Sequence, residues 1–321
     1  MRALVTGGAG FIGSHLVDRL LADGHSVTVI DNFSCGTSRN LPSSSSLAEG
    51  RLEIAKMDIT DAKRVNKIFS EDKYDVVFHL AAQADIRKSL LGFKGDLDNN
   101  VVGTLNILEA MKKYGVNDLV FASSSAIYGE ATVRPTPEDY SPIQTSLYGA
   151  SKLACEAFAE AYTEFTRIKL WAFRFTNVIG ERCRRGVVGD FVRKLLKNPK
   201  ELEILGDGKQ SKEYLYVKDC VNGMITGHLQ SSKKTNIFNL GVDCQTIVDE
   251  VADIVIEEMG LGNIKRKYTG GNRGWIGDNP IVELSLNKIK RLGWNTEVSS
   301  EDAIRRTARW NIENEQEQVD R

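Results

Sequence analysis

The sequence has little of several residue types that mark particular protein classes. Its 321 residues include five cysteines and four histidines, and no two cysteines have the Cys-x-x-Cys spacing. Scattered thiols and histidines without ligand spacing argue against a disulfide framework and against a metal site. No stretch has the roughly twenty consecutive apolar residues that span a bilayer. We therefore expect no bound metal, no membrane partner and reduced thiols in the cytoplasm.

The sequence also has no excess of either positive or negative charge. The chain has 42 basic and 43 acidic residues, a formal net charge of −1. Without a global basic field, nucleic acid is not an expected partner. The first residues already have the pattern of a strand, so we expect no signal peptide.

What is present is a glycine-rich turn at the very start of the chain. The apolar run 2–5 breaks into Thr6-Gly-Gly-Ala-Gly-Phe-Ile-Gly13, after which apolar residues recur at helical spacing. Glycines let a backbone approach a pyrophosphate, and the free N–H groups of the following helix favour the anion. A second apolar run, 25–30, ends in Asp31, at about the twenty-residue offset at which a carboxylate binds the ribose hydroxyls of NAD. Because that carboxylate would repel a 2′-phosphate, the pair predicts NAD rather than NADP.

Alternating elements predict the fold class. Further strands are expected at 52–56, 75–80, 118–122 and 168–175, with helices at about 61–69, 97–114 and 146–165, while the serine-rich stretch 37–46 should be a loop. This is the pattern of an α/β protein with a Rossmann-type doubly wound parallel sheet, in which ligands bind at the carboxyl ends of the strands. We assign 1–178 to an NAD-binding domain. Residues 179–321 form mainly a smaller α/β substrate-binding portion, with some return to the large domain.

The pair Tyr148 and Lys152 predicts the chemistry. Four residues apart on a helix, the two side chains share one face, and a nearby ammonium should lower the pKa of the phenol towards that of a general base. The same spacing at Tyr214 and Lys218 carries little weight, because no serine-rich strand end precedes it. The first pair follows Ser123 to Ser125, whose hydroxyls can relay a proton.

Together these residues resemble the extended short-chain dehydrogenase/reductases and, among them, the UDP-glucose 4-epimerases. The resemblance covers nearly the whole chain. It rests on the glycine turn and Asp31-Asn32, Asp58-Ile59, Ala81-Ala82, Asn100-Val101-x-Gly103-Thr104, Ser123 to Gly129, Tyr148 with Lys152, Asn177, and Gly206-Asp207-Gly208 leading to Tyr216-Val217-x-Asp219.

The resemblance implies roles for individual residues. For the NAD cofactor it implies Gly7, Gly10, Phe11, Ile12, Gly13, Asp31, Asn32, Asp58, Ile59, Leu80, Ala81, Ala82, Gln83, Asn99, Tyr148 and Lys152. For catalysis it implies Ser124 as proton relay, Tyr148 as base and Lys152 as its partner. For a UDP-sugar substrate it implies Ser124, Tyr148, Asn177, Val187, Leu205, Lys212 and Arg273.

Two departures concern the nucleotide pocket. Lys212-Glu213 stands where the family often has arginine and aspartate, and a lysine cannot make the bidentate phosphate contact of an arginine. The late motif 273–278 is also longer than the common form. Arg182 to Arg185 could contact a diphosphate or be a solvated loop.

The serine-rich strand end separates reaction types. The 4,6-dehydratases carry Thr-Asp-Glu where this chain has Ser124, Ser125 and Ala126, and decarboxylating relatives also need a glutamate. The resemblance thus favours an epimerase that interconverts UDP-glucose and UDP-galactose through a 4-keto sugar. Alternatives are a 4-epimerase of UDP-N-acetylhexosamine, weakly permitted by the aliphatic Ile281 and Val282, or of UDP-uronic acid, a dehydratase, and a non-catalytic NAD-sensing protein.

The family further implies a homodimer. Helices 97–114 and 146–165 would pack as a four-helix bundle, with Leu105, Leu108, Met111, Phe158 and Tyr162 as candidate contacts. Alternatively, these side chains simply cover the sheet.

Overall fold

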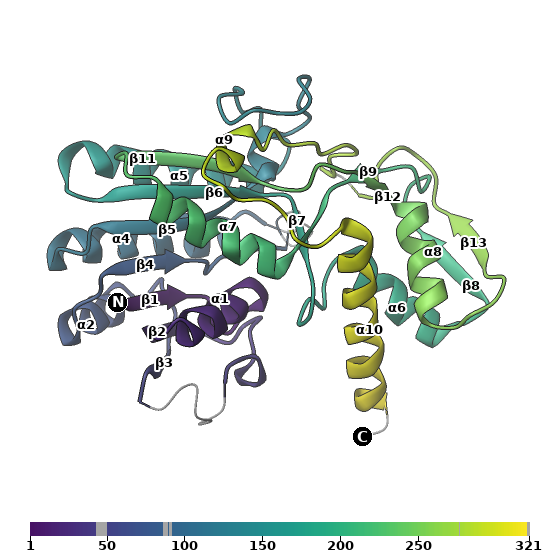
Figure 1. Ribbon diagram of the computed structural model, residues 1–321, viewed down its shortest axis with the longest axis horizontal. Coiled ribbons are helices and arrows are strands. Elements are labelled where there is room, and N and C mark those ends of the chain that lie inside the picture. The colour runs from purple at the N-terminus through teal and green to yellow at the C-terminus, as the bar shows by residue number, and fades with distance from the viewer. Residues whose placement is uncertain (43–49, 86–88, 90–91, 276, 320–321) are drawn as a thin grey trace. The chain divides into compact units, whose positions relative to one another are not determined.

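The computed structural model describes residues 1–42, 50–85, 89, 92–275 and 277–319 (Figure 1). The chain forms two compact units. Unit 1 comprises 1–129, 141–174 and 221–238, and unit 2 comprises 130–140, 175–220 and 239–321. Part of the expected serine-rich loop, 43–46, lies outside the described residues. The predicted domain boundary at residue 178 stays a prediction.

Unit 1 is built on a seven-stranded sheet with the order β11-β6-β5-β4-β1-β2-β3. The pairings of β1 with β2 and β4, of β2 with β3 and of β4 with β5 are parallel, which confirms the predicted doubly wound fold. The strands are β1 (Arg2–Thr6), β2 (Ser26–Asp31), β3 (Leu52–Lys56), β4 (Val76–His79), β5 (Asp118–Ser124), β6 (Lys169–Phe175) and β11 (Thr235–Leu240).

Helices cover both faces of this sheet, with α1 and α7 on the face towards the viewer in Figure 1. On the other face, buried side chains such as Ile107, Leu108 and Ala159 pack on Leu119, Phe121 and other strand residues to form one apolar core. The helical elements are α1 (Phe11–Ala22), η1 (Ser38–Asn40), α2 (Ala62–Glu71), η2 (Asp96–Val102), α4 (Gly103–Tyr114), η3 (Ser125–Tyr128), α5 (Leu147–Phe165) and α7 (Val217–Gln230), whose first residues belong to unit 2.

Unit 2 consists of short strand pairs and helices. Strand β7 pairs in parallel with β10, β8 with β13, and β9 antiparallel with β12. Its elements are β7 (Asn177–Ile179), α6 (Val187–Lys197), β8 (Glu201–Ile204), β9 (Ser211–Lys212), β10 (Tyr214–Tyr216), β12 (Thr246–Ile247), α8 (Val248–Glu258), β13 (Lys265–Tyr268), α9 (Asn287–Lys290) and α10 (Ser300–Val319).

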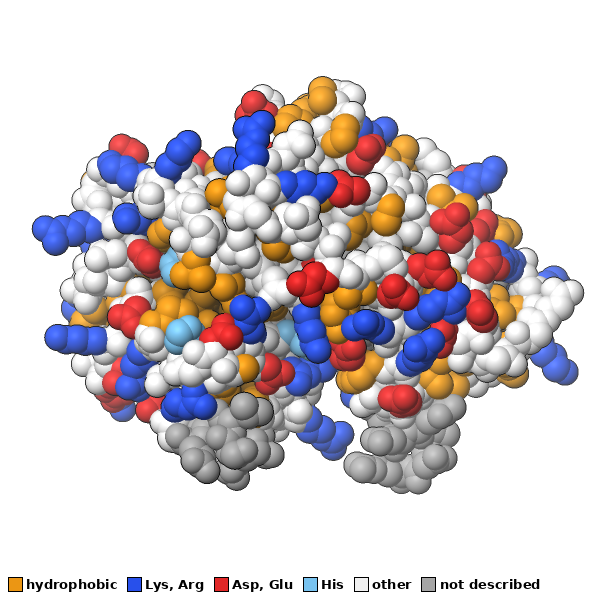
Figure 2. Space-filling model, in the orientation of Figure 1, with side chains coloured by type: hydrophobic (Ala, Val, Ile, Leu, Met, Phe, Trp, Pro, Cys, Tyr) orange, Lys and Arg blue, Asp and Glu red, His pale blue; other side chains and the backbone are white. Residues whose placement is uncertain are grey.

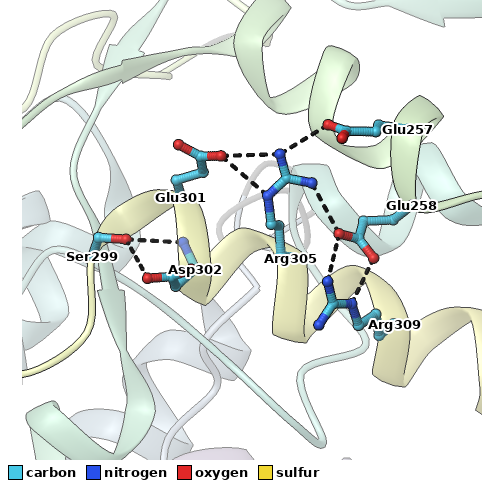
Figure 3. Close-up of polar contacts among 7 residues, drawn as sticks. All are labelled: Glu257, Glu258, Ser299, Glu301, Asp302, Arg305 and Arg309. Atoms are coloured by element: carbon cyan, nitrogen blue, oxygen red, sulfur yellow. Dashed lines mark hydrogen bonds and ion pairs between the residues drawn. The ribbon is translucent and has the colours of Figure 1, made fainter.

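A cluster of ion pairs fastens α10 to α8 (Figure 3). Arg305 donates to Glu257 at 2.8 Å, to Glu258 at 2.9 Å and to Glu301 at 2.9 Å. Arg309 binds the same Glu258 through two nitrogens, at 2.6 and 2.9 Å. Glu258 therefore accepts from both arginines, and only 9% of its side chain is exposed.

Three elements differ from the sequence expectations. The helix expected from residue 97 begins as the π-helical segment η2 before it becomes α4. Helix α10, which runs to Val319, was not predicted, because its sequence is strongly polar and only one side, including Ala303 and Ile304, is buried. Leu108 and Met111, considered as dimer contacts, are fully buried in the core of unit 1, so they cover the sheet.

Charges of both signs alternate over the face shown in Figure 2, in line with the net charge of −1. No helix in the described part of the chain combines the length and apolar character that a bilayer-spanning segment requires.

The α8–α10 contact generates a stability prediction. The two arginines hold the pKa of Glu258 below its ordinary 4.5 in spite of some opposing burial, chiefly through the Arg309 hydrogen bond. A carboxyl whose pKa is lower in the folded protein than in the unfolded chain stabilises the fold at pH values above its unfolded pKa. This contribution is lost as the pH falls through the folded pKa. We expect Glu258→Gln to lower Tm by about 1–3 °C at pH 7.

The difference from wild type should disappear as the pH falls below 4.5, the ordinary pKa of the carboxyl. Calorimetry between pH 3 and 7 measures this, with the exposed Glu313→Gln on α10 as control. A pH-independent difference would contradict the ion-pair account.

Candidate active site

The glycine turn is packed so tightly that side chains cannot enter it. Gly7 has φ +70°, and a Cβ there would lie 2.7 Å from the Ala81 nitrogen. A Cβ on Gly13 would lie 2.1 Å from the Gly7 carbonyl oxygen. Helix α1 begins after Gly10, which has no side chain to cap it, with Phe11 and Ile12 as its first residues. The turn thus presents backbone N–H groups and a helix N-terminus, which fits the pyrophosphate of NAD.

Asp31 connects the end of β2 to this turn. Its carboxylate accepts hydrogen bonds from the Ala9 nitrogen at 2.9 Å and from the Phe33 nitrogen at 2.8 Å, and the residue is 8% exposed. A carboxylate has about four acceptor positions, so two remain for ribose hydroxyls. The residue therefore shapes the turn as well as fitting the predicted ribose contact.

Asn32, Asp58 and Ile59 lie next to one another. The Asn32 amide donates to Asp58 at 2.7 Å, and Thr60 donates to the same carboxylate through its nitrogen and its hydroxyl, at 2.9 and 2.7 Å. Ile59 is buried against Gly103, where a Cβ would come within 2.4 Å of its side chain. These contacts fix the edge that the resemblance assigns to the adenine.

The strand end 80–83 is held by Asn100. Its side chain accepts from the Gln83 nitrogen at 2.7 Å and donates to the Gln83 carbonyl at 3.2 Å and to the Ser151 hydroxyl at 2.8 Å. Leu80, Ala81, Ala82 and Gln83 are all partly exposed. The Asn99 amide donates to the Gly95 carbonyl at 3.0 Å, inside its own helix. Asn100, buried and not singled out for this role by the sequence, is the residue that orders this segment.

His79 is a structural residue at the end of β4. Its ring nitrogens lie 2.6 Å from the Thr6 hydroxyl and 2.9 Å from the Thr104 hydroxyl. Burial, with a smaller contribution from the Lys152 charge, lowers the pKa of His79 to about 3. The ring is therefore neutral at physiological pH and joins β1, β4 and α4.

Ser124, Tyr148 and Lys152 are brought together where β5 ends and α5 begins. Ser124 caps η3 by accepting from the Ala126 nitrogen at 3.1 Å, and Ser146 caps α5 by accepting from the Gly149 nitrogen at 3.0 Å. The Ser124 hydroxyl also lies close enough to the Tyr148 phenol to lower its pKa. The Lys152 ammonium, almost fully buried, donates to the Ala122 carbonyl at 2.7 Å. By contrast, Tyr214 and Lys218 lie on different elements, β10 and α7.

The predicted lowering of the Tyr148 pKa is wrong for the protein alone. Burial raises the pKa of the phenol to about 12, and the Ser124 hydrogen bond only partly offsets this. Burial also lowers the pKa of Lys152 to about 8. The spacing of the two side chains along the helix does not reveal the loss of water around them, nor that the ammonium is directed towards the Ala122 carbonyl oxygen.

Asp96 is a residue that the sequence analysis missed. It is 3% exposed, and among the described residues neither of its carboxylate oxygens has a partner at full hydrogen-bond geometry. Burial raises its pKa, with the Ser89 hydroxyl acting in the opposite direction. Its charge is one of the influences that raise the pKa of Tyr148. An aspartate in the first turn of a helix is common, and nothing in the local sequence shows that this one is buried.

In unit 2, Lys212 lies in a buried ion pair. Its ammonium contacts the Asp278 carboxylate and the Asn279 carbonyl, both at 2.5 Å, and lies 5.7 Å from the centre of the Trp275 ring. Asp278 also accepts from the Gly274 nitrogen at 3.0 Å. Lys212 therefore fastens the long late motif, and in this structure an acidic residue already contacts it.

The other sugar-nucleotide candidates of unit 2 lie in three places. Leu205, 37% exposed, is near Arg273, since a Cβ on Gly206 would lie 3.0 Å from the Arg273 carbonyl. The Arg273 side chain pairs with Glu130. Asn177, exposed at the start of β7, donates to the Glu213 carbonyl at 3.2 Å. Val187 is the first residue of α6.

The stretch 182–185 packs within unit 2. The Arg184 guanidinium lies 5.5 Å from the centre of the Trp310 ring, and Asn311 donates to the Cys183 carbonyl at 2.9 Å. These contacts give the stretch a structural role on α10. Its assignment to a diphosphate stays untested. Among the described residues, no group of three or more histidine, cysteine or acidic side chains could hold a metal ion.

The glycine turn generates a binding prediction. We expect Gly13→Ala to weaken NAD binding at least about tenfold, because the new methyl group forces the Gly7 carbonyl out of the turn. NAD content after purification and titration with NAD measure the effect. Gly262→Ala, where a Cβ would have no neighbour within 4 Å, is the control. Unchanged NAD affinity in the first variant would contradict this account of the turn.

The Asp96 charge generates a pH prediction. Because this charge raises the pKa of Tyr148, Asp96→Asn should lower that pKa, so the acid side of the pH profile of kcat should shift to lower pH. Asp98→Asn is the control, since Asp98 belongs to the same helical segment but pairs with Lys94 at 2.6 Å on the surface. A shift to higher pH, or equal shifts in both variants, would refute the assignment.

Comparison with known proteins agrees with this arrangement. The model of the NAD dependent epimerase/dehydratase family matches residues 3–241. A UDP-glucose 4-epimerase of Mycolicibacterium smegmatis is 33% identical over 313 residues, covering 96% of this chain and 97% of that protein.

Two solved structures show the same likeness. The UDP-glucose 4-epimerase of Thermus thermophilus in complex with NAD is 34% identical, with a TM-score of 0.86 and coverage of 97% of this chain and 99% of that one. The UDP-N-acetylglucosamine 4-epimerase of Methanobrevibacter ruminantium is 29% identical, with a TM-score of 0.85 and 98% of each chain covered. The predicted NAD cofactor and enzyme class are confirmed at the level of the family. The glycine turn, the tyrosine–lysine pair and these likenesses lead to one conclusion: the chain belongs to the NAD dependent epimerase/dehydratase family.

Proposed function

We propose that the protein is a UDP-hexose 4-epimerase that interconverts UDP-glucose and UDP-galactose. The observation that carries the proposal is the contact of Ser124 with Tyr148 beside Lys152, with Ser125 and Ala126 in place of the acidic pair of a dehydratase. This arrangement supplies one base and one proton relay next to the NAD-binding residues. At positions 125 and 126 it offers no carboxylic acid for the elimination of water.

Unit 1 contains two groups of residues, one that would bind the cofactor and one that would transfer the proton. The glycine turn and Asp31 would hold the pyrophosphate and ribose of NAD, and the 80–83 segment would lie along its remaining length. Bound NAD would supply a reversible hydride acceptor for C4 of the sugar. Tyr148 takes the proton of the sugar 4-hydroxyl, with the Ser124 hydroxyl between them as relay, and gives it back when the keto group is reduced. Lys152 stabilises the phenolate and binds the nicotinamide ribose.

Epimerisation requires the 4-keto sugar to turn over while its nucleotide stays bound. In unit 2, Asn177, Lys212 and Arg273 are the proposed diphosphate contacts, and Val187 and Leu205 the proposed nucleoside contacts. Because Lys212 contacts Asp278, its charge would be shared between that carboxylate and the diphosphate. This suits a loose, non-bidentate contact with the diphosphate.

A second candidate substrate is a UDP-N-acetylhexosamine. The likeness to the Methanobrevibacter ruminantium enzyme supports it, as do the aliphatic Ile281, which is 38% exposed, and Val282. A UDP-uronic acid is a third candidate. A non-catalytic NAD-sensing role is disfavoured, because Ser124, Tyr148 and Lys152 are all present.

We also propose a homodimer in the cytoplasm. Phe158 on α5 is 43% exposed, and Leu97 and Val102 in η2, which precedes α4, are 45% and 39% exposed. Burial of these side chains between two copies would remove apolar surface from water. Leu108 and Met111 take no part, since both are core residues.

The test is incubation of the purified protein with UDP-galactose without added NAD, followed by separation of the sugar nucleotides. We expect UDP-glucose to form, because the cofactor is regenerated in each turnover, and we expect Tyr148→Phe to reduce kcat by at least about a thousandfold. Conversion of UDP-N-acetylglucosamine or UDP-glucuronate but not UDP-galactose would move the assignment to that sugar. No conversion of any sugar nucleotide, with NAD supplied, would refute an epimerase.

A further inference from the structure

Beside the candidate catalytic residues lies a buried ion pair to which the proposed reaction gives no role. Glu156 lies on α5, four residues after Lys152, and Arg174 lies on β6. Their side chains are 2% and 6% exposed. Arg174 donates through Nε to both Glu156 oxygens, at 3.1 and 3.2 Å, and through Nη2 at 2.7 Å. The pair is thus desolvated and bidentate.

Each member of the pair also binds the chain next to Ser124. The Ser123 hydroxyl donates to Glu156. Arg174 Nη1 donates to the Tyr128 hydroxyl at 2.8 Å, and its guanidinium lies 5.0 Å from the centre of the Tyr128 ring. Ser123 is the last residue before Ser124, and Tyr128 ends the short helix η3 that Ser124 caps. The ion pair therefore holds the backbone on both sides of the candidate proton relay.

Stability alone is a weak reason for such a pair. Removing two charges from water costs free energy that their attraction seldom exceeds, so an apolar pair of equal volume would often be at least as stable. Charge-assisted hydrogen bonds do fix positions closely, and an error of about 1 Å between reacting groups is enough to slow catalysis strongly. The feature to explain is that the two charged side chains hydrogen-bond to Ser123 and Tyr128, which lie on either side of Ser124 in the chain.

We propose that Glu156 and Arg174 are positioning residues, which hold the Ser124 hydroxyl in line with the Tyr148 phenol by fixing Ser123 and Tyr128. This inference rests on the proposed roles of Ser124 and Tyr148. The two residues act through their neighbours and do not touch the substrate. They also connect α5, which carries Tyr148 and Lys152, to β5 and β6, so the base and its relay are located by the same contact.

The test removes the hydrogen bonds that Ser123 and Tyr128 make with the ion pair, and it leaves the ion pair itself in place. In the variant Ser123→Ala/Tyr128→Phe, we expect kcat to fall about 10- to 100-fold, with KM for the sugar nucleotide, NAD content and Tm close to wild type. The Ser124 hydroxyl lowers the pKa of Tyr148, so its displacement should also move the acid side of the pH profile of kcat to higher pH. A purely structural role would lower Tm without this shift.

A matched control is Thr163→Val/Tyr74→Phe, which removes one buried hydroxyl from the same helix α5 and one from a buried tyrosine elsewhere in unit 1. Equal kcat values for the test and control variants would overturn the inference, as would a wild-type pH profile in the test variant. Tyr148→Phe, measured in parallel, separates the two proposals. An active Tyr148→Phe protein refutes the proposed function. An inactive one, together with a fully active Ser123→Ala/Tyr128→Phe protein, refutes only the positioning role.

Discussion

The close approach of α5 to the end of β5 is the constraint on which the candidate active site depends. Gly149, the second residue after Leu147 in α5, has no room for a side chain, since a Cβ would lie 2.6 Å from the Ala126 carbonyl oxygen. This approach allows Tyr148 to reach Ser124, and it places Lys152 against the Ala122 carbonyl oxygen. One turn further along the helix, Glu156 meets Arg174 and the chain around Ser124. A single helix–strand contact thus positions the proposed base, its proposed relay and the neighbouring lysine.

Burial then sets the electrostatics of the site. The same packing that orders the two residues buries Lys152 and leaves Tyr148 only partly exposed, so the neutral form of each is favoured, with pKa values of about 8 for Lys152 and about 12 for Tyr148. An added charge near such groups shifts their pKa values. A cationic nicotinamide nearby would lower the pKa of Tyr148 and so favour the phenolate. Asp96 works against the phenolate, and Ser124 works for it. The balance among these few groups sets the pH at which the Tyr148 phenol loses its proton.

Much of this could be predicted from the sequence, for physical reasons that differ between residues. The parallel sheet and the glycine turn were predictable, because buried strands give apolar runs and a turn at a phosphate needs residues without side chains. The sequence pattern located the end of β5 and the start of α5 to within a few residues. Ser124, Tyr148 and Lys152 could therefore be placed together.

Other features depend on contacts distant in the chain. Asn100 meets Gln83, and Arg174 meets both Glu156 and Tyr128, and no local pattern marks such partners. An arginine within an apolar strand and a glutamate on the buried face of a helix were a signal that each needs an opposite charge. Their identity as one pair required the fold. The pKa of Tyr148 was mispredicted for a related reason, since burial is a property of the whole structure.

The central claim is that C4 of the sugar loses a hydride and recovers the same hydrogen, while Tyr148 moves only the hydroxyl proton. It is tested most directly with UDP-galactose that carries deuterium at C4, converted in ordinary water by the purified protein. The account predicts that the UDP-glucose formed keeps the deuterium at C4, as read by mass spectrometry and NMR. Replacement of the deuterium by hydrogen from water would contradict it, because it would mean that C4 is deprotonated and not oxidised.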